Sequence, residues 1–260
     1  MKTGVQVSSL KPILQSDIQV LEAFVRLREI GCDTVQLQWI DPTVSIETIA
    51  RALEENGLRS VSVQDFYEVI RLNKAYYIDL NRRTGGTWMC VSRIPERLKS
   101  LQGIERYAQE LRLFQSELED VGQKLCFHPV SADYQPIEGV NPVDRLMALM
   151  PELALCVDLY HLGRCGVDMP AWIGRHAERI CMVHFKDARR RADGEEQLVP
   201  AGQGEIDWRG VVKACLDARV PYGFVEQETW SRDPFECLKE AMDWVEAEKA
   251  ACRTDDDSLA

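Results

Sequence analysis

Several features are scarce or missing in this chain of 260 residues, and each absence excludes a class of protein. No apolar run approaches the roughly 20 residues that span a bilayer, and no apolar N-terminal segment has a basic flank. Basic residues are outnumbered, with 31 Lys and Arg against 42 Asp and Glu, so the formal charge is −11. Phosphate contacts need clustered Lys and Arg, which this balance does not supply. We therefore expect a cytoplasmic globular protein with no membrane or nucleic-acid partner.

Cysteine is present, but not in a pattern that builds a cross-linked framework. The chain has 9 cysteines, an odd number, and no Cys-x-x-Cys pair. Cys90, Cys126, Cys156 and Cys181 all lie inside apolar runs of strand length. Because buried free cysteine behaves as a small hydrophobic residue, we expect reduced core residues rather than disulfides or zinc ligands.

Short apolar runs alternate with segments of helical periodicity along the whole chain. The predicted strands are residues 4–10, 34–40, 58–64, 87–94, 124–129, 153–161, 180–187 and 222–228. Strict alternation of strand and helix predicts a parallel sheet closed into a single (β/α)8 TIM barrel over residues 1–250. The arginine-rich segment 188–192 is expected to be a loop, and the polar tail 251–260 is expected to be disordered.

Three consecutive predicted strands each end in a residue of a type that binds metals: Asp158, His184 and Glu226. The chain has only 4 histidines, and His128 and His161 also fall at or just after strand ends. One such residue alone is often a helix cap or a rim residue, but the active sites of TIM barrels lie where these strand ends meet. Oxygen, nitrogen and oxygen donors suit one divalent ion, Mn, Mg, Co, Zn or Fe(II), rather than a thiolate-seeking ion.

These motifs together resemble the sugar phosphate isomerase/epimerase family of xylose isomerase-like TIM barrels. The resemblance rests on VDLYHLGRCGVD, VHFKD, PAGQGEIDW and GFVEQE in the second half of the chain, while the first half matches in architecture alone. It implies that Asp158, His184 and Glu226 are metal ligands. It also implies that Glu226 serves as a catalytic acid or base.

The resemblance implies roles for the residues around the metal as well. His161 would be a catalytic residue that faces the substrate and orients one of its hydroxyls. Lys186 and Asp187 match substrate-side and supporting positions. Arg190 lies six residues after His184, where related epimerases carry an arginine that touches the substrate.

The fifth strand departs from the family's pattern. The family usually has a glutamate there, as fourth metal ligand and second acid–base group, whereas this chain has FHPVSADYQPIEG. Asp133 stands in that place with a side chain one methylene shorter, and His128 is the alternative. We expect Asp133, slightly ahead of His128, to be the fourth ligand and a catalytic group. His128 would otherwise bind the substrate.

The chemistry explains why these residue types are needed. A divalent ion bound to carbonyl and hydroxyl oxygens acidifies the neighbouring C–H, and a carboxylate then takes that proton. The resemblance therefore implies a metal-dependent isomerase or epimerase that converts a sugar, sugar phosphate or keto-polyol through an enediolate. A lyase or dehydratase acting on a keto-sugar or keto-inositol is one alternative, and a non-catalytic sugar-binding barrel is another. The expected partner is a small carbohydrate, and the sequence is also compatible with a homo-oligomer.

Overall fold

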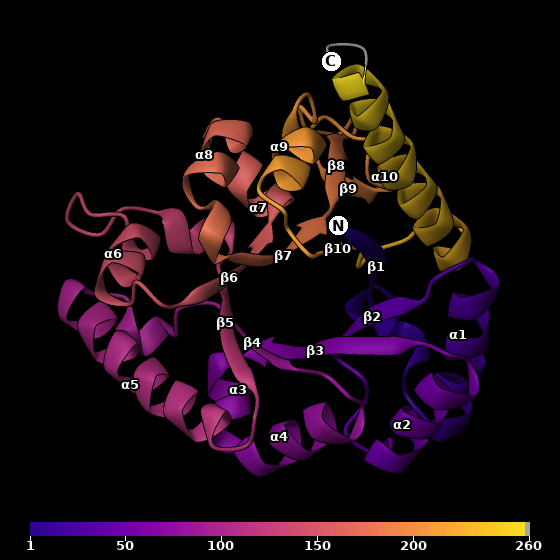
Figure 1. Ribbon diagram of the computed structural model, residues 1–260, viewed down its shortest axis with the longest axis horizontal. Helices are drawn as coiled ribbons and strands as arrows, with labels where there is room; N and C mark the ends of the chain where they lie inside the picture. Colours follow the sequence, from indigo (N-terminus) through magenta and orange to yellow (C-terminus); the bar gives the residue numbers. More distant parts are fainter. Residues whose placement is uncertain (258–260) are drawn as a thin grey trace.

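The computed structural model describes residues 1–257, and in it eight parallel strands close into a barrel (Figure 1). Around the barrel the strands follow the order β1-β10-β7-β6-β5-β4-β3-β2. They are β1 (Lys2–Gln6), β2 (Thr34–Leu37), β3 (Arg59–Phe66), β4 (Trp88–Ser92), β5 (Lys124–His128), β6 (Ala154–Asp158), β7 (Ile180–Phe185) and β10 (Tyr222–Val225). The predicted (β/α)8 TIM barrel is confirmed.

Helices surround the barrel, because each parallel strand must be reached by a connection that crosses the outside of the sheet. They are α1 (Asp17–Glu29), α2 (Ile46–Glu55), α3 (Tyr67–Leu72), α4 (Lys74–Arg83), α5 (Leu101–Glu119), α6 (Pro142–Leu149), α7 (Leu159–Gly163), α8 (Met169–Arg175), α9 (Val211–Asp217) and α10 (Pro234–Asp257). Ser16, Ser45 and Ser100 cap α1, α2 and α5, each accepting a backbone N–H three residues on.

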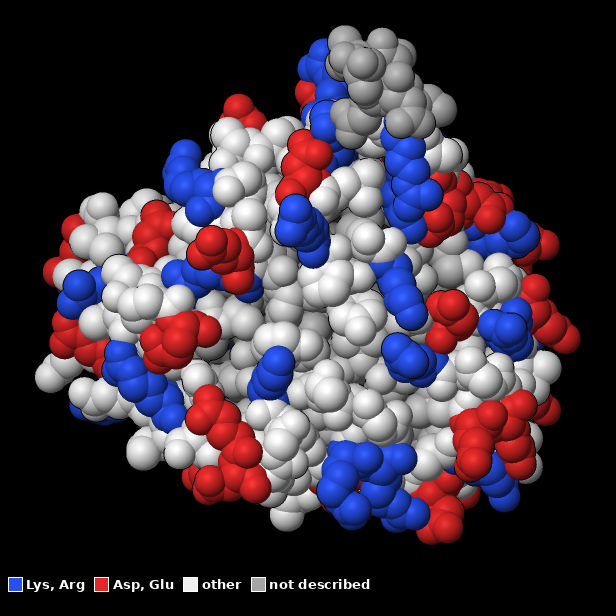
Figure 2. Space-filling model, viewed as in Figure 1, with Lys and Arg blue, Asp and Glu red and all other residues white. Residues whose placement is uncertain are grey.

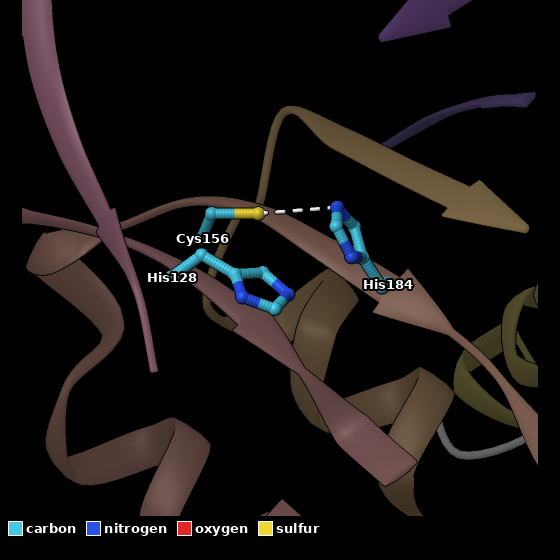
Figure 3. A group of neighbouring side chains, drawn as sticks. All are labelled: His128, Cys156 and His184. Carbon is cyan, nitrogen blue, oxygen red and sulfur yellow. Dashed lines mark hydrogen bonds between the residues drawn. The ribbon is translucent and has the colours of Figure 1, made fainter. Parts of the chain in front are cut away.

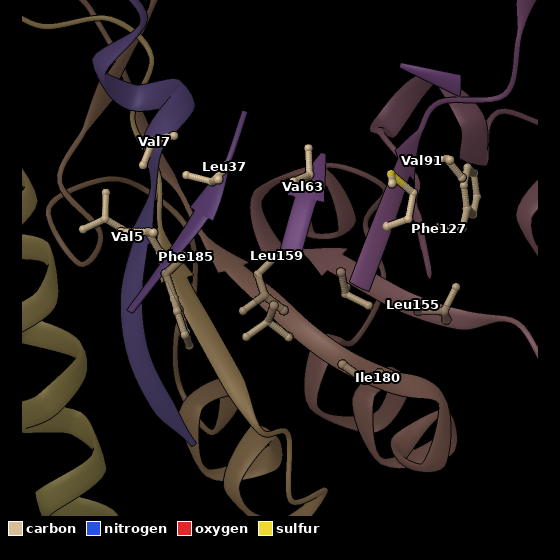
Figure 4. Packing of buried hydrophobic residues seen from close by; sticks show 14 of the residues in the cluster. Val5, Val7, Leu37, Val63, Val91, Phe127, Leu155, Leu159, Ile180 and Phe185 are labelled. Carbon is tan, nitrogen blue, oxygen red and sulfur yellow. The ribbon is translucent and has the colours of Figure 1, made fainter. Parts of the chain in front are cut away.

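Buried apolar side chains form two regions. The larger one lies between strands and helices, and Figure 4 shows part of it, including Val5, Leu37 and Phe185. The smaller one fills the inside of the barrel and consists of Val61, Cys90, Cys126, Cys156, Cys181, Met182 and Phe224. All nine cysteines are free, and the four that were predicted to lie in the core are buried, so that prediction is confirmed.

Some predicted strands run too far. The sixth strand ends at Asp158 and α7 begins at once, since the Asp158 carboxylate accepts a backbone N–H of the new helix. The first strand gives way to a 3-10 helix over Val7–Ile13. The segment predicted as an arginine-rich loop is partly a strand, because β8 (Asp187–Arg190) pairs antiparallel with β9 (Glu196–Val199).

The last helix is longer than expected. α10 runs to Asp257, so residues 251–257 of the expected disordered tail are helical, and residues 258–260 lie outside the described part. The Glu-, Lys- and Ala-rich run before them favours helix, which explains the continuation. Within residues 1–257 no helix is both long and apolar enough to cross a membrane. The face in Figure 2 mixes Lys and Arg with Asp and Glu around a largely uncharged middle.

Candidate metal centre and active site

The three residues predicted to bind metal come together at the ends of three adjacent strands. Asp158 on β6, His184 on β7 and Glu226 directly after β10 are buried, and one ligand-type atom of each lies within 4.8 Å of those of the other two. His184 Nδ1 is 3.1 Å from Glu226 Oε2. The parallel register explains this arrangement, since it pairs Asp158 with His184 across β6 and β7.

His128, at the end of β5, extends the group. Its Nε2 lies 3.9 Å from Asp158 Oδ2, and its ring centroid is 4.8 Å from that of His184 (Figure 3). Burial, helped by the nearby His184, lowers the pKa of His128 to about 3. The imidazole is therefore neutral at pH 7, with one nitrogen free to act as an electron-pair donor.

Each of the two histidines is held through its other ring nitrogen. His184 Nε2–H donates to Gln36 Oε1 at 2.6 Å, and His128 Nδ1 pairs with Ser92 Oγ at 3.1 Å. Metal-bound histidines are typically oriented in this way through the nitrogen that does not bind the ion. The sequence analysis did not find Gln36 or Ser92, because neither residue lies in a recognisable motif.

Each of the two carboxylates is likewise held through one of its two oxygens. The backbone N–H of His161 donates to Asp158 Oδ1 at 3.1 Å, and Ser8 Oγ donates to Glu226 Oε1 at 2.8 Å. Each carboxylate is fixed through one oxygen, and its second oxygen faces the shared centre. Ser8, which follows β1, was also missed by the sequence analysis.

The atoms that face the centre lack partners. Within residues 1–257, His128 Nε2, Asp158 Oδ2 and His184 Nδ1 are buried and make no hydrogen bond. Such orphaned atoms are rare in folded proteins. Two ligands about 2.1 Å from a shared ion at a tetrahedral angle lie about 3.4 Å apart, close to the 3.1 Å and 3.9 Å separations seen here. These side chains therefore fit a divalent ion that takes nitrogen and oxygen ligands.

A second group of ligand-type atoms joins Cys156 to His128 and His184 (Figure 3). Cys156 Sγ lies 3.2 Å from His184 Nε2, but this nitrogen carries the hydrogen that it donates to Gln36. Burial raises the pKa of Cys156 to about 12, so the thiol keeps its proton. Cys156 is therefore a neutral neighbour of His184 and not a thiolate ligand.

Asp133 is not placed as the sequence led us to expect. Its Oδ1 accepts the Ile94 backbone N–H at 3.1 Å, and its Oδ2 accepts that of Val130 at 2.9 Å. Burial raises the pKa of Asp133, although these two hydrogen bonds act in the opposite direction. Its short side chain is turned to the backbone of its own loop, and it belongs to neither group of clustered ligand atoms. The geometry favours His128 over Asp133 as the fourth ligand, contrary to the order given by the sequence.

Lys186 brings a buried positive charge to the site. Its Nζ lies 2.6 Å from Glu228 Oε2 and 5.4 Å from the centre of the Tyr160 ring. Burial alone would lower the pKa of Lys186, but the charges of Glu226, Asp158 and Glu228 raise it above its ordinary value. Burial would likewise raise the pKa of Glu226, but Lys186 and neighbouring histidines bring it well below its usual range. Lys186 is thus protonated and Glu226 ionised at neutral pH.

Asp187 organises the loop that follows β9. Its Oδ2 accepts the backbone N–H groups of Gly202 and Gly204, each at 3.0 Å, and the indole N–H of Trp208 at 2.8 Å. A Cβ at Gly204 would lie 2.0 Å from Asp187 Oδ1, so no larger residue fits without movement. Asp187 therefore supports the loop, in keeping with the supporting position that its motif implied.

Two further predicted residues differ in where they lie relative to this centre. His161 is partly buried, with Nδ1 3.3 Å from Ser131 Oγ and Nε2 3.8 Å from Asp158 Oδ2. Arg190 is exposed on β8, and its backbone N–H donates to Glu205 at 3.0 Å. It lines a separate cleft of about 790 Å³ whose walls include none of the clustered ligand residues. The structure brings His161 to the metal-ligand group and leaves Arg190 outside it.

Comparison with known proteins identifies the family. The profile of the xylose isomerase-like TIM barrel family matches residues 24–248, and the chain belongs to this family. The resemblance inferred from the motifs is thus confirmed. A curated relative, the inosose dehydratase of Lacticaseibacillus casei, is 25% identical over 196 residues, which cover 68% of this chain. The matched region spans 59% of that relative's length.

Solved structures share the fold at low sequence identity. A sugar phosphate isomerase/epimerase from Parabacteroides distasonis has a TM-score of 0.77 and 15% identity, and the match covers 94% of this chain and 93% of the other. The IolI protein with a bound zinc atom has a TM-score of 0.70 and 14% identity, with coverage of 97% and 98%. At these identities the likeness concerns the fold alone.

Proposed function

We propose that this protein is a metal-dependent isomerase or epimerase that moves a proton beside the carbonyl group of a sugar or a related keto-polyol. One observation carries the proposal: buried atoms of His128, Asp158 and His184 make no hydrogen bond. Asp158, His184 and Glu226 cluster together, and His128 Nε2 lies 3.9 Å from Asp158 Oδ2. We assign these four residues as the ligands of one divalent ion. The family and the bound zinc of the IolI protein support the assignment.

The protein's own side chains supply the proton chemistry. When bound, the ion would polarise the carbonyl of the substrate and acidify the adjacent C–H. Glu226 is ionised and is fixed by Ser8 through Oε1. Its Oε2 would hold the ion, so Oε1 is the oxygen that accepts the proton. Lys186 is protonated and buried beside Glu226, so its Nζ can donate to a substrate oxygen that gains negative charge.

The number of bases separates the candidate reactions. One carboxylate can return the proton to the adjacent carbon on the same face of an enediolate, which gives aldose–ketose isomerisation. Epimerisation requires a second group that delivers a proton from the opposite face. We assign that role to His161, whose Nε2 lies 3.8 Å from Asp158 Oδ2 and whose side chain is partly exposed.

A dehydration is the second candidate, favoured by the position of Asp133. With Asp133 bonded to the backbone, the family's second acid–base carboxylate is missing from the clustered ligand residues. In an elimination Glu226 takes the C–H proton, the β C–O bond breaks, and the hydroxyl group leaves as water with a proton from Lys186. The curated relative is an inosose dehydratase, which supports this alternative.

Proton NMR in heavy water tests both candidates. Metal-loaded protein is incubated with a panel of ketoses, aldoses and a keto-inositol. An isomerase or epimerase exchanges the proton beside the carbonyl and places deuterium in the product and in recovered substrate, whereas a dehydratase forms an unsaturated or deoxygenated ketone. Glu226→Gln keeps the side-chain size and is expected to lower exchange at least about 100-fold. Binding of sugars without exchange or elimination would contradict the enzyme assignment and favour a sugar-binding barrel.

A further inference from the structure

A pocket that the proposed reaction does not use lies on the same side of the barrel, at the ends of β2 and β3. Its volume is about 550 Å³, within the range of about 300–1,000 Å³ typical of ligand sites. We infer that this pocket binds a second, uncharged ring, so that the substrate is a glycoside whose first sugar unit carries the carbonyl group and reacts at the metal centre. The inference rests on the proposed function for the first ring, whereas the pocket itself can be tested separately.

The walls of the pocket suit a ring with an apolar face. Trp39, Tyr76 and Tyr77 provide aromatic surfaces, and Leu37 and Ile40 add aliphatic ones. A pyranose ring has C–H groups on its faces and hydroxyls around its edge, and an aryl ring is apolar throughout. Both kinds of ring can pack their faces on aromatic side chains.

A chain of buried glutamines joins this pocket to the metal centre. Gln36, which accepts from His184, donates through Nε2 to Gln64 Oε1 at 3.0 Å. Gln64 Nε2 in turn donates to Gln38 Oε1 at 3.3 Å, and Gln38 and Gln64 both line the pocket. Three consecutive hydrogen bonds therefore link the wall of the pocket to a proposed metal ligand. The inference is that a molecule with two linked rings spans the two places across these glutamines.

Trp39 is held in a strained backbone conformation at the rim of this pocket. Its φ is +56°, in the left-handed region that bulky residues rarely adopt. The Phe66 ring lies 5.9 Å from the indole, and the Lys11 ammonium lies 4.8 Å from its centre. Strain of this kind tends to occur at ligand sites. We take its presence here as support for a binding role of the indole.

The charges around the pocket favour a neutral ligand. Asp41 and Asp65 line it together with one cation, Lys11. Two carboxylates beside one ammonium group would repel a phosphate, which needs several positive donors. Asp65 also fixes an aromatic wall, because its Oδ2 accepts the hydroxyl of Tyr77 at 2.5 Å. The pocket thus matches a sugar or aryl ring better than a phosphorylated group.

Calorimetric titration of the full-length, metal-loaded protein tests the inference. The probes are methyl α- and β-glucoside as one-ring ligands, and maltose, cellobiose and the two phenyl glucosides as two-ring ligands. At least one two-ring probe is expected to bind about tenfold or more tightly than its methyl glucoside. Trp39→Gly should abolish this preference, and the backbone should be retained because glycine accepts a positive φ without strain.

Two more variants complete the design. Tyr76→Ala removes a second aromatic wall of the pocket. It replaces Trp39→Gly as the test variant if circular dichroism shows that Trp39→Gly does not fold. Trp88→Phe changes a tryptophan at the start of β4, at the opposite end of that strand from the barrel mouth, and should keep the preference. A preference for the disaccharides indicates a second sugar, and a preference for the phenyl glucosides indicates an aromatic aglycone. Either result supports the pocket.

The inference and the proposed function fail in different ways. Equal affinity for one-ring and two-ring probes, or a preference that survives both Trp39→Gly and Tyr76→Ala, would overturn the pocket assignment whether or not the protein turns over a sugar. A preference that persists in His184→Ala, while metal binding and turnover are absent even from the wild type, would keep the pocket and reject the proposed function.

Discussion

At the scale of single residues, each proposed ligand uses one atom for position and leaves another for the shared centre. Ser8 holds Glu226 and Gln36 holds His184, so residues with no chemistry of their own decide where the reactive atoms point. Partners of this kind are expected to change metal affinity or activity by about 10–100-fold when they are lost. The proposed chemistry therefore depends on β2 and on the segment after β1 as well as on the strands that carry the proposed ligands.

Asp133→Ala is expected to destabilise the fold without loss of metal. The substitution leaves the buried backbone N–H groups of Ile94 and Val130 without acceptors, at a cost of about 2–4 kcal/mol in the free energy of unfolding. Urea unfolding in the presence of chelator measures this cost. Asp133→Asn keeps one oxygen acceptor, so its free energy of unfolding should fall by about half as much as that of Asp133→Ala. A fully stable Asp133→Ala protein that no longer binds metal would show that the sequence placed the fourth ligand correctly.

Asp65 should leave a signature in the pH dependence of stability. Burial raises the pKa of Asp65 above 3.8, although the hydrogen bond from Tyr77 opposes this shift. Between 3.8 and the raised value the folded state holds more protons than the unfolded state, so this residue's contribution to stability falls as pH rises through that window.

The comparison with Asp65→Asn isolates the effect. The wild type should lose stability relative to the variant as pH increases above about 4, by at most about 1.4 kcal/mol per pH unit, and the difference should then level off. Chemical unfolding of both proteins across pH 4–8 measures it. A difference that does not vary with pH, or that grows in favour of the wild type, would rule out the raised pKa.

The sequence could predict only part of the site at this scale. Asp158, His184 and Glu226 were identified because each ends an apolar run, which is a local signal. The contacts that hold them are not local: Ser8 and Glu226 are 218 residues apart, and Gln36 and His184 are 148 apart. Such pairs exist only once the barrel has closed. Asp133 was expected ahead of His128 for the same reason, because nothing in its loop shows which way its carboxylate turns.

At the scale of secondary-structure elements, the loop after β9 depends on the close approach of Gly204 to Asp187. Gly204→Ala would bring a Cβ to 2.0 Å from Asp187 Oδ1 and 2.5 Å from the Ala188 carbonyl oxygen. We expect a loss of about 1–3 kcal/mol in unfolding free energy, as is usual for overpacking, together with lower activity. Differential scanning calorimetry and turnover assays measure the two effects.

Gly174→Ala is a matched control for this substitution. Gly174 lies in α8, and its added Cβ would meet nothing within 4 Å. Because alanine has a higher helix propensity than glycine, the free energy of unfolding of this variant should rise by up to about 1 kcal/mol. Equal behaviour of the two alanine variants would show that the contact between Gly204 and Asp187 does not constrain the loop.

The elements themselves were more predictable than their ends. Each barrel strand was found from an apolar run, since strands buried on both faces are continuously apolar. The β8 and β9 hairpin was missed because its strands include exposed, charged residues such as Arg189, Arg190 and Glu196. The sixth strand was drawn too long because Asp158 both ends it and caps α7, which periodicity alone does not show.

At the scale of the whole molecule, the barrel brings the proposed ligands together from the ends of four strands. β5, β6, β7 and β10 are consecutive in the closed sheet, and the pocket inferred for a second ring lies across the mouth at β2 and β3. This architecture was predictable because the alternation of strand and helix is repeated along the whole chain. The pocket was not, because its walls come from segments that share no motif.

Metal analysis by inductively coupled plasma mass spectrometry tests the central claim most directly. Wild type, Asp158→Ala, His128→Ala and Asp133→Ala are purified, loaded with a divalent ion and freed of excess. We predict about one ion per chain in the wild type and in Asp133→Ala, none in Asp158→Ala, and reduced occupancy in His128→Ala. A wild-type protein that retains no divalent ion after loading, whichever of Mn, Co, Zn, Mg or Fe(II) is offered, would contradict the assignment of this site as a metal centre.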